Sequence, residues 1–128
     1  MRYYPVCLDV KDKRCVIVGG GEVSARKIIF LLNCGANIVV ISPQINEEIN
    51  AFVQEKSIEW IERGYQSNDL KGAFFVIIAT DDPELNKQIS QEARDIGILV
   101  NMADSAEDST FILPAILSRG SLSIAVST

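Results

Sequence analysis

Apolar residues occur along this chain in two patterns, short uninterrupted runs and runs with helical spacing. Uninterrupted apolar runs predict strands that are buried on both faces. These strands are expected over residues 14–18, 37–41, 73–79 and 98–101. Helical spacing predicts helices over residues 22–33, 45–53 and 83–95. Because strands and helices alternate, the pattern favours a doubly wound, mainly parallel α/β sheet.

Less regular segments predict the outer strands. Loose alternation over residues 4–10 predicts a short strand, and Pro5 within it favours an edge position. Residues 57–63 alternate well enough to predict another strand that is less deeply buried. Two final apolar runs, 111–117 and 122–126, predict an antiparallel hairpin around residues 118–121. The expected fold is therefore a Rossmann-like, mainly parallel sheet to which a C-terminal hairpin adds antiparallel strands.

The segment from Arg14 to Ala25, RCVIVGGGEVSA, joins a strand to a helix through three consecutive glycines. Gly19 and Gly21 allow a tight turn and a close approach of pyrophosphate to the backbone, and the first amides of the helix favour an anion. The third motif position holds Ser24, where glycine or alanine is usual, although serine is small enough for close packing. This turn predicts a nucleotide site; a plain strand-to-helix turn is the alternative.

Ligands of doubly wound sheets bind beyond the carboxyl ends of the strands, where four loops should gather. These loops are 19–23, 42–44, 80–82 and 101–104. Ser42 stands where an NAD-binding fold usually has an acid that holds the ribose hydroxyls. Serine lacks the charge that repels a 2′-phosphate, and no arginine is close in sequence to attract one. The residues alone leave NAD and NADP both open.

Asp104 is the candidate catalytic carboxylate, because it follows a strand end across from the glycine turn and lies among small residues. An acidic residue in a surface loop can also be merely solvated. Asp81 and Asp82 are interpreted more simply as helix caps.

Composition and charge argue against several classes of function. The 128 residues fit one domain, and the formal net charge of −5 gives no attraction to nucleic acid or to an anionic membrane. No apolar run reaches the roughly 20 residues of a membrane span, so a cytoplasmic location is expected. The sequence has no histidine, and its three cysteines share no metal-type spacing, so no metal site is predicted.

Several motifs in order along the whole chain resemble the precorrin-2 dehydrogenase family, the domain that begins siroheme synthase. They are CVIVGGGEVSARK, GANIVVISP, FFVIIATDD, VNMADSAEDSTFILPAI and LSIAVST. The resemblance implies NAD-dependent oxidation of precorrin-2 to sirohydrochlorin and, in bifunctional members, insertion of ferrous iron. Because family members bind NAD with a serine-proline segment after the second strand, it also favours NAD over NADP.

The resemblance also assigns roles to individual residues. Asp104 matches the family's functional aspartate, and we expect it to accept a proton during the oxidation. Apart from this resemblance, Asn101 and Arg119 are the candidate substrate-binding residues, and Arg119 on the hairpin turn is chosen because the substrate carries many carboxylates. The residues expected to bind or line NAD are Gly19, Gly20, Gly21, Glu22, Val23, Ser42, Pro43, Gln44, Thr80 and Asp81.

Family chains continue into a helical region that dimerises, whereas this sequence ends at Thr128. We therefore expect a homodimer for the full-length protein and weak or no activity for the 128-residue piece alone. Ferrochelatase activity is left open. The alternative function is a regulatory NAD(H)-sensing module without catalysis, but such modules generally carry an acid where this chain has Ser42.

Overall fold

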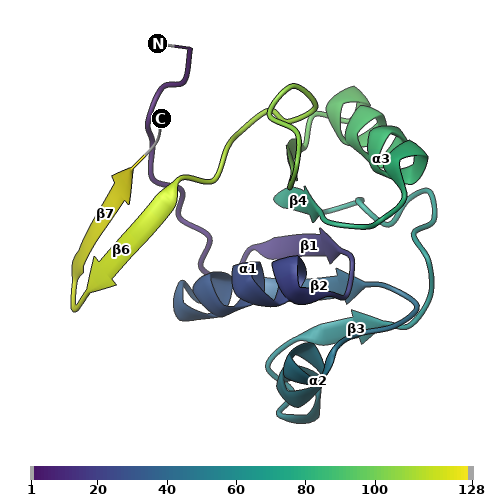
Figure 1. The fold of residues 1–128 in the computed structure, drawn as a ribbon, viewed down its shortest axis with the longest axis horizontal. Helices are drawn as coiled ribbons and strands as arrows, with labels where there is room; N and C mark the ends of the chain where they lie inside the picture. The colour runs from purple at the N-terminus through teal and green to yellow at the C-terminus, as the bar shows by residue number, and fades with distance from the viewer. Residues whose placement is uncertain (1, 127–128) are drawn as a thin grey trace.

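A five-stranded parallel sheet forms the centre of the molecule (Figure 1). The computed structural model describes residues 2–126. The strands are β1 (Arg14–Val18), β2 (Asn37–Ile41), β3 (Glu59–Ile61), β4 (Phe75–Ile78), β5 (Leu99–Met102), β6 (Ala115–Arg119) and β7 (Leu122–Val126). The helices are α1 (Glu22–Asn33), α2 (Glu47–Gln54) and α3 (Pro83–Asp95). The strand order in the main sheet is β3-β2-β1-β4-β5, which confirms the predicted doubly wound α/β fold.

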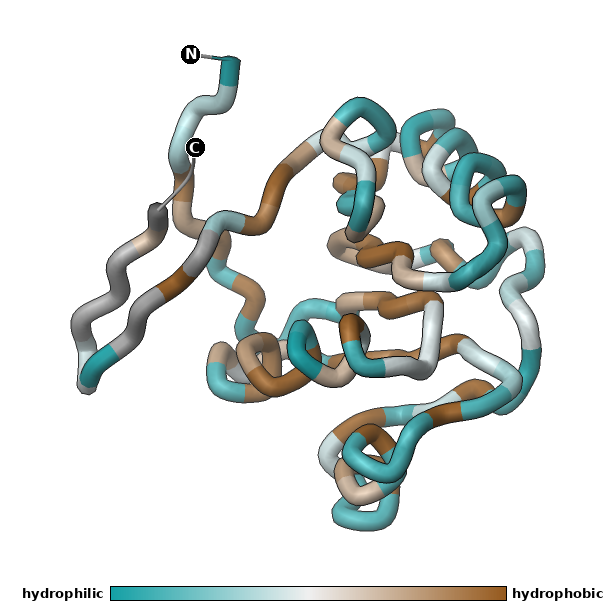
Figure 2. The backbone as a smooth tube through the Cα atoms, in the orientation of Figure 1, coloured by the Kyte–Doolittle hydropathy of each residue, from teal (hydrophilic) through white to brown (hydrophobic). Residues whose placement is uncertain are grey.

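Two hydrophobic cores lie on opposite faces of this sheet. Alternate residues of β1 divide between them: Ile17 packs in the core that contains Ile28 of α1 and Ile49 of α2. Val16 packs in the core that contains Ile89 of α3. The helices therefore cover both faces, which explains why the central strands are continuously apolar. Figure 2 shows hydrophobic colour along β1 and β2 and mostly hydrophilic colour on α3.

The parallel register places the ends of neighbouring strands side by side. Ile17 is paired with Val40 of β2 and with Ile77 of β4. On the outer side of β2, Ile41 is paired with Ile61 of β3. Because the strands are parallel and level, the loops that follow them meet at one edge of the sheet, where the sequence predicted a ligand site.

The N-terminal segment corrects one prediction. Residues 4–10 form no strand in the structure, and the side chain of Tyr4 is 88% exposed. The physical reason is that β1 is already paired on both sides, with β2 and β4, so the sheet offers no free edge beside it. Pro5 also lacks the N–H that a strand ladder would use.

The position of the C-terminal hairpin also differs from its prediction. Strands β6 and β7 pair with each other as a separate two-stranded sheet, and the main sheet is wholly parallel. The prediction that the hairpin adds antiparallel strands to the main sheet is therefore wrong. The predicted strand over 111–117 is also placed too early, because β6 begins at Ala115. Phe111 instead packs its ring against Phe75, with the ring centroids 5.4 Å apart.

Candidate dinucleotide site

The glycine turn is fixed to its neighbours by backbone contacts. The N–H of Gly19 donates to the carbonyl oxygen of Ile41 at 3.0 Å, and the carbonyl oxygen of Gly20 accepts from the N–H of Asn46 at 2.9 Å. Gly19 has a φ of 128°, and a Cβ there would lie 2.4 Å from the carbonyl oxygen of Ala79. This position therefore requires glycine both for its conformation and for its space.

Gly21 differs, because a Cβ at this residue would meet nothing within 4 Å. It is the N-cap of α1, and no side chain of residues 2–126 caps this helix. By contrast, Asn46 caps α2 by accepting from Ile49, and Asp82 caps α3. The first amides of α1 thus stay available next to open space, at the positive end of a 12-residue helix. This arrangement fits the pyrophosphate of a dinucleotide.

Ser24, the unusual residue of the glycine motif, is fully buried where α1 meets the turn. Its Oγ would be 3.2 Å from a Cβ on Gly19 and has no hydrogen-bond partner among the described residues. Serine therefore fills the close helix-strand contact that the motif requires, as its size predicts.

In the loop that follows β2, the side chain of Ser42 points into the protein. Its side chain is buried, with 9% of the residue exposed, and its hydroxyl donates to the carbonyl oxygen of Gln44 at 2.6 Å. Its own carbonyl oxygen accepts from Nε1 of Trp60 at 2.9 Å. Pro43 and Gln44 are exposed. The hydroxyl of Ser42 is therefore engaged within its own loop, and its contact with a ribose stays a prediction.

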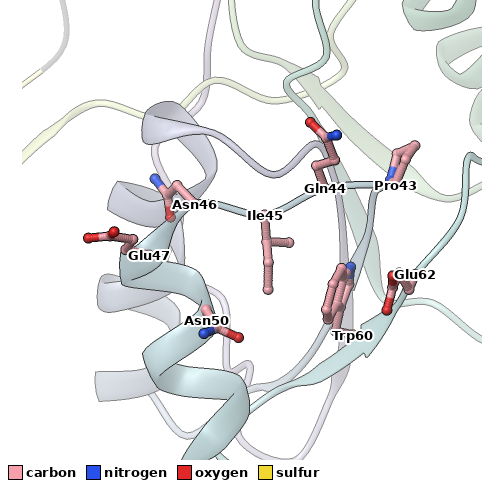
Figure 3. A pocket seen from close by; sticks show the side chains of 8 residues that line it. All are labelled: Pro43, Gln44, Ile45, Asn46, Glu47, Asn50, Trp60 and Glu62. Atoms are coloured by element: carbon pink, nitrogen blue, oxygen red, sulfur yellow. The ribbon is translucent and has the colours of Figure 1, made fainter.

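A cavity of about 430 Å³ opens beside this loop, between β3 and α2 (Figure 3). Figure 3 shows Ile45 and Trp60 facing into it, with Asn50 on the α2 side and Glu62 beside Trp60. Its lining residues are Pro43, Gln44, Ile45, Asn46, Glu47, Asn50, Trp60 and Glu62. Pro43 and Gln44 were expected here, whereas sequence reasoning missed the others. The parallel crossover from 37–41 to 57–63 is the signal that could have placed Trp60 and Glu62.

The third loop, after β4, is tied to α3. The hydroxyl of Thr80 donates to Oδ1 of Asn86, and Nδ2 of Asn86 donates to the Thr80 carbonyl oxygen at 3.0 Å. Asp82 accepts from the backbone N–H groups of Glu84 and Leu85, so it is the cap of the helix. Asp81 is exposed. The loop belongs to the same edge as the glycine turn, because the N–H of Ala79 donates to the Val18 carbonyl oxygen at 2.8 Å.

The fourth loop carries Asp104 in a tight turn, in which the N–H of Ser105 donates to the carbonyl oxygen of Met102 at 3.0 Å. The side chain of Asp104 is exposed at this turn. Asn101, in contrast, is buried, and its Nδ2 donates to the carbonyl oxygen of Phe111 at 3.1 Å. The structure thus uses Asn101 to hold the returning chain against β5. Its contact with a substrate remains a prediction.

Arg119 is not brought to this edge. It is an exposed residue at the end of β6. Figure 1 shows the β6–β7 hairpin on the opposite side of the molecule from the arrowheads of β1, β2 and β3. Within this chain, Arg119 is therefore separated from the glycine turn, and its role toward a substrate also stays a prediction.

Two pairs of hydrogen-bonded side chains hold the β3–β4 connection, and each pair contains a group with a shifted pKa. Nη1 and Nη2 of Arg63 donate to the two carboxylate oxygens of Asp69, each at 2.8 Å, and this pair lowers the pKa of Asp69. Tyr65 donates to Glu92 of α3, and burial together with this bond raises the pKa of Tyr65. The first pair joins two residues within the connection, and the second attaches the connection to α3. The guanidinium of Arg63 is therefore occupied by its bonds to Asp69.

Two further observations concern the described residues. No group of three or more His, Cys, Asp and Glu side chains in this part of the chain is arranged to hold a metal ion. None of the helices between residues 2 and 126 has the length and apolar character needed to cross a membrane.

The parallel sheet, the glycine turn and the uncapped α1 together define a dinucleotide-binding domain of the doubly wound class. Comparison with known families agrees, since residues 6–115 match a family described as putative NAD(P)-binding. The chain belongs to this family.

Comparison with individual proteins shows which members of this family the chain is similar to. The chain is 43% identical over 129 residues to a siroheme synthase of Nitrosomonas eutropha, and 41% identical over 128 residues to one of Azotobacter vinelandii. Each comparison covers 100% of this chain but only 27% and 28% of those relatives. Among solved structures, SirC, a precorrin-2 dehydrogenase, matches with a TM-score of 0.80 and 35% identity, covering 98% of this chain and 62% of that one. These similarities confirm the resemblance drawn from the sequence motifs.

Proposed function

We propose that this chain is the NAD-binding domain of a precorrin-2 dehydrogenase, which oxidises precorrin-2 to sirohydrochlorin in siroheme biosynthesis. The observation that carries the proposal is the match to SirC, which extends over 98% of this chain at a TM-score of 0.80. The open space at Gly21 and the uncapped start of α1 support it independently, because they fit a dinucleotide pyrophosphate.

In this proposal each loop contacts a different part of NAD. The amides that follow Gly21, at Glu22 and Val23, would hold the pyrophosphate, and Pro43 with Gln44 would contact the adenosine half. Thr80 and Asp81 would line the cleft on the β4 side, where Asn86 holds Thr80 in place. NAD, when bound, supplies a hydride acceptor for the oxidation.

Asp104 is proposed as the base. Oxidation of precorrin-2 removes two hydrogens from the macrocycle, one with its electron pair as hydride and the other as a proton. The exposed carboxylate of Asp104 would accept that proton as a new carbon–carbon double bond forms. The cytoplasmic location and the homodimer of the full-length protein remain predictions that the sequence supports.

The decisive experiment mixes the protein with precorrin-2 and NAD under anaerobic conditions and follows sirohydrochlorin and NADH by absorbance. Equal amounts of the two products are expected. A matched Asp104→Asn variant should lose turnover and still bind NAD in a titration. Full activity of that variant would remove Asp104 from the mechanism. NAD binding without turnover, even in a form of the chain extended to the length of SirC, would favour the sensing module.

A further inference from the structure

Glu62 lies beside the position where dinucleotide-binding folds usually carry an acid. That acid, at the end of the second strand, holds the ribose hydroxyls of NAD and disfavours a 2′-phosphate. Here the second strand is followed by Ser42, which is buried and engaged within its loop. On the adjacent strand, Ile61 is paired with Ile41, and its carbonyl oxygen accepts from the N–H of Ser42 at 3.3 Å. Glu62 follows Ile61, so it stands level with Ser42, one strand outward.

The cavity beside β2 combines this carboxylate with the loop expected to contact adenosine. Glu62 and Glu47 line the same space as Pro43 and Gln44. None of the eight lining residues is basic. The aromatic face of Trp60 and the amide of Asn50 complete a wall suited to a neutral nucleoside (Figure 3). The lining residues would suit the adenosine half of a dinucleotide, and two carboxylates lie among them.

Arg63 is the cation nearest to Glu62 in sequence, and it does not offset this charge. Its guanidinium makes two hydrogen bonds of 2.8 Å to Asp69, and its Nη1 also donates to the carbonyl oxygen of Gly64 at 2.9 Å. Because these bonds occupy the fork of the guanidinium, its charge is balanced within the β3–β4 connection.

We propose that Glu62, reinforced by Glu47, makes this site select an adenosine ribose with a free 2′-hydroxyl, and therefore NAD over NADP. This inference rests on the proposed function, since it requires a dinucleotide at the glycine turn. A 2′-phosphate would bring a charge of about −1.5 to −2 toward these carboxylates. Both side chains are exposed, so the repulsion is partly screened by water and salt. The carboxylate that is missing after β2 is thus supplied by Glu62, directly after β3.

The test measures the dissociation constants of NAD and NADP by calorimetry for the unmodified chain, Glu62→Gln and Glu59→Gln. Glu59 is an exposed residue of β3, the strand that ends just before Glu62, and it does not line the cavity, so it controls for net charge. The ratio of the NADP constant to the NAD constant should fall about tenfold in Glu62→Gln. It should change by less than about twofold in Glu59→Gln, and all ratios should converge in about 1 M salt, where the Debye length is about 3 Å.

The possible outcomes separate the two proposals. If NAD binds and the ratio in Glu62→Gln equals that of Glu59→Gln, selection by Glu62 is wrong and the cofactor proposal stands. If the unmodified chain binds neither dinucleotide, both proposals fall. Should Glu62→Gln fail to fold, Glu47→Gln decides the question, with an expected fall of about threefold in the same ratio.

Discussion

The carbonyl oxygen of Gln44 occupies the space into which a side chain on Gly20 would project: a Cβ on that glycine would lie 2.0 Å from the oxygen. The same Cβ would lie 2.9 Å from the Oγ of Ser42. The glycine turn and the loop after β2 are therefore packed backbone to backbone. Gly20 is required by the fold, whereas the neighbouring Gly21 faces open space.

Two alanine substitutions should separate these roles. Gly20→Ala should destabilise the protein by about 2 kcal/mol, because backbone must move to admit the methyl group. Gly21→Ala should cost less than about 1 kcal/mol, because alanine is a poorer N-cap than glycine. It should weaken NAD binding about tenfold, because its methyl group would occupy the proposed phosphate site. Urea unfolding and NAD titration of both variants check this. Equal loss of stability in the two variants would contradict the assignment.

The pair formed by Arg63 and Asp69 predicts an acid dependence of stability. Arg63 lowers the pKa of Asp69 below its ordinary value of 3.8 in the folded protein. The pair therefore stabilises the fold above that value, and this contribution is lost as the pH falls below it. Asp69→Asn should cost about 1 kcal/mol at neutral pH and reduce the acid sensitivity of unfolding. Urea unfolding from neutral to acidic pH measures both effects.

Asp95→Asn is the matched control for this variant, because Asp95 is an exposed carboxylate of α3. It should unfold like the unmodified chain at every pH. A similar loss of stability in both variants would show that the change in net charge, not the pair with Arg63, is responsible.

The pair formed by Tyr65 and Glu92 predicts a loss of stability at alkaline pH. Burial, and then the bond and charge of Glu92, raise the pKa of Tyr65 above its ordinary value of 10.0. The folded state therefore favours the protonated phenol, so this contribution is present below pH 10 and is lost as the pH rises through the folded pKa. Tyr65→Phe should cost about 1 kcal/mol at neutral pH and flatten the alkaline decline. Thermal unfolding across alkaline pH tests this, with the exposed Tyr4→Phe as the control.

The three cysteines should react in two classes. Cys7 and Cys34 are exposed, whereas Cys15 is fully buried in β1, and burial raises the pKa of its thiol to about 11. A thiol reagent at neutral pH should modify two cysteines rapidly and the third on the order of a hundredfold more slowly, because little thiolate forms there. In denaturant all three should react alike. Rapid modification of Cys15 in the folded protein would contradict its burial.

The sequence was sufficient to predict the parallel sheet because its strands are buried on both faces. Val16 and Ile17 point to opposite cores, so no polar residue interrupts the run. The same reasoning failed for residues 4–10, where alternating Tyr4, Val6 and Leu8 are exposed. A local pattern indicates that a strand could form, but it does not reveal whether a neighbouring edge is free to pair with it.

The site could be predicted in outline for the same reason. Parallel strands that end level must bring their loops together, so the meeting of the four loops at one edge was predicted correctly, and ligand binding there stays a prediction. The bond from the Ser42 hydroxyl to the carbonyl oxygen of Gln44 lies within one loop, and the residue types there did not indicate it. The cavity at Trp60 and Glu62 was missed, although the crossover offered a signal for it, because its exact lining depends on the register between β2 and β3. That pairing joins residues about twenty positions apart, and no local spacing encodes it.

The backbone bonds that hold the glycine turn also affect how a ligand would arrive. The N–H of Gly19 donates to Ile41 and the carbonyl oxygen of Gly20 accepts from Asn46, so the turn is held by the protein's own backbone. A dinucleotide at the proposed phosphate site would therefore bind beside a turn whose shape these hydrogen bonds fix. Association with such a preorganised turn loses little conformational entropy. Differences in affinity among nucleotides should then arise mainly in their rates of dissociation.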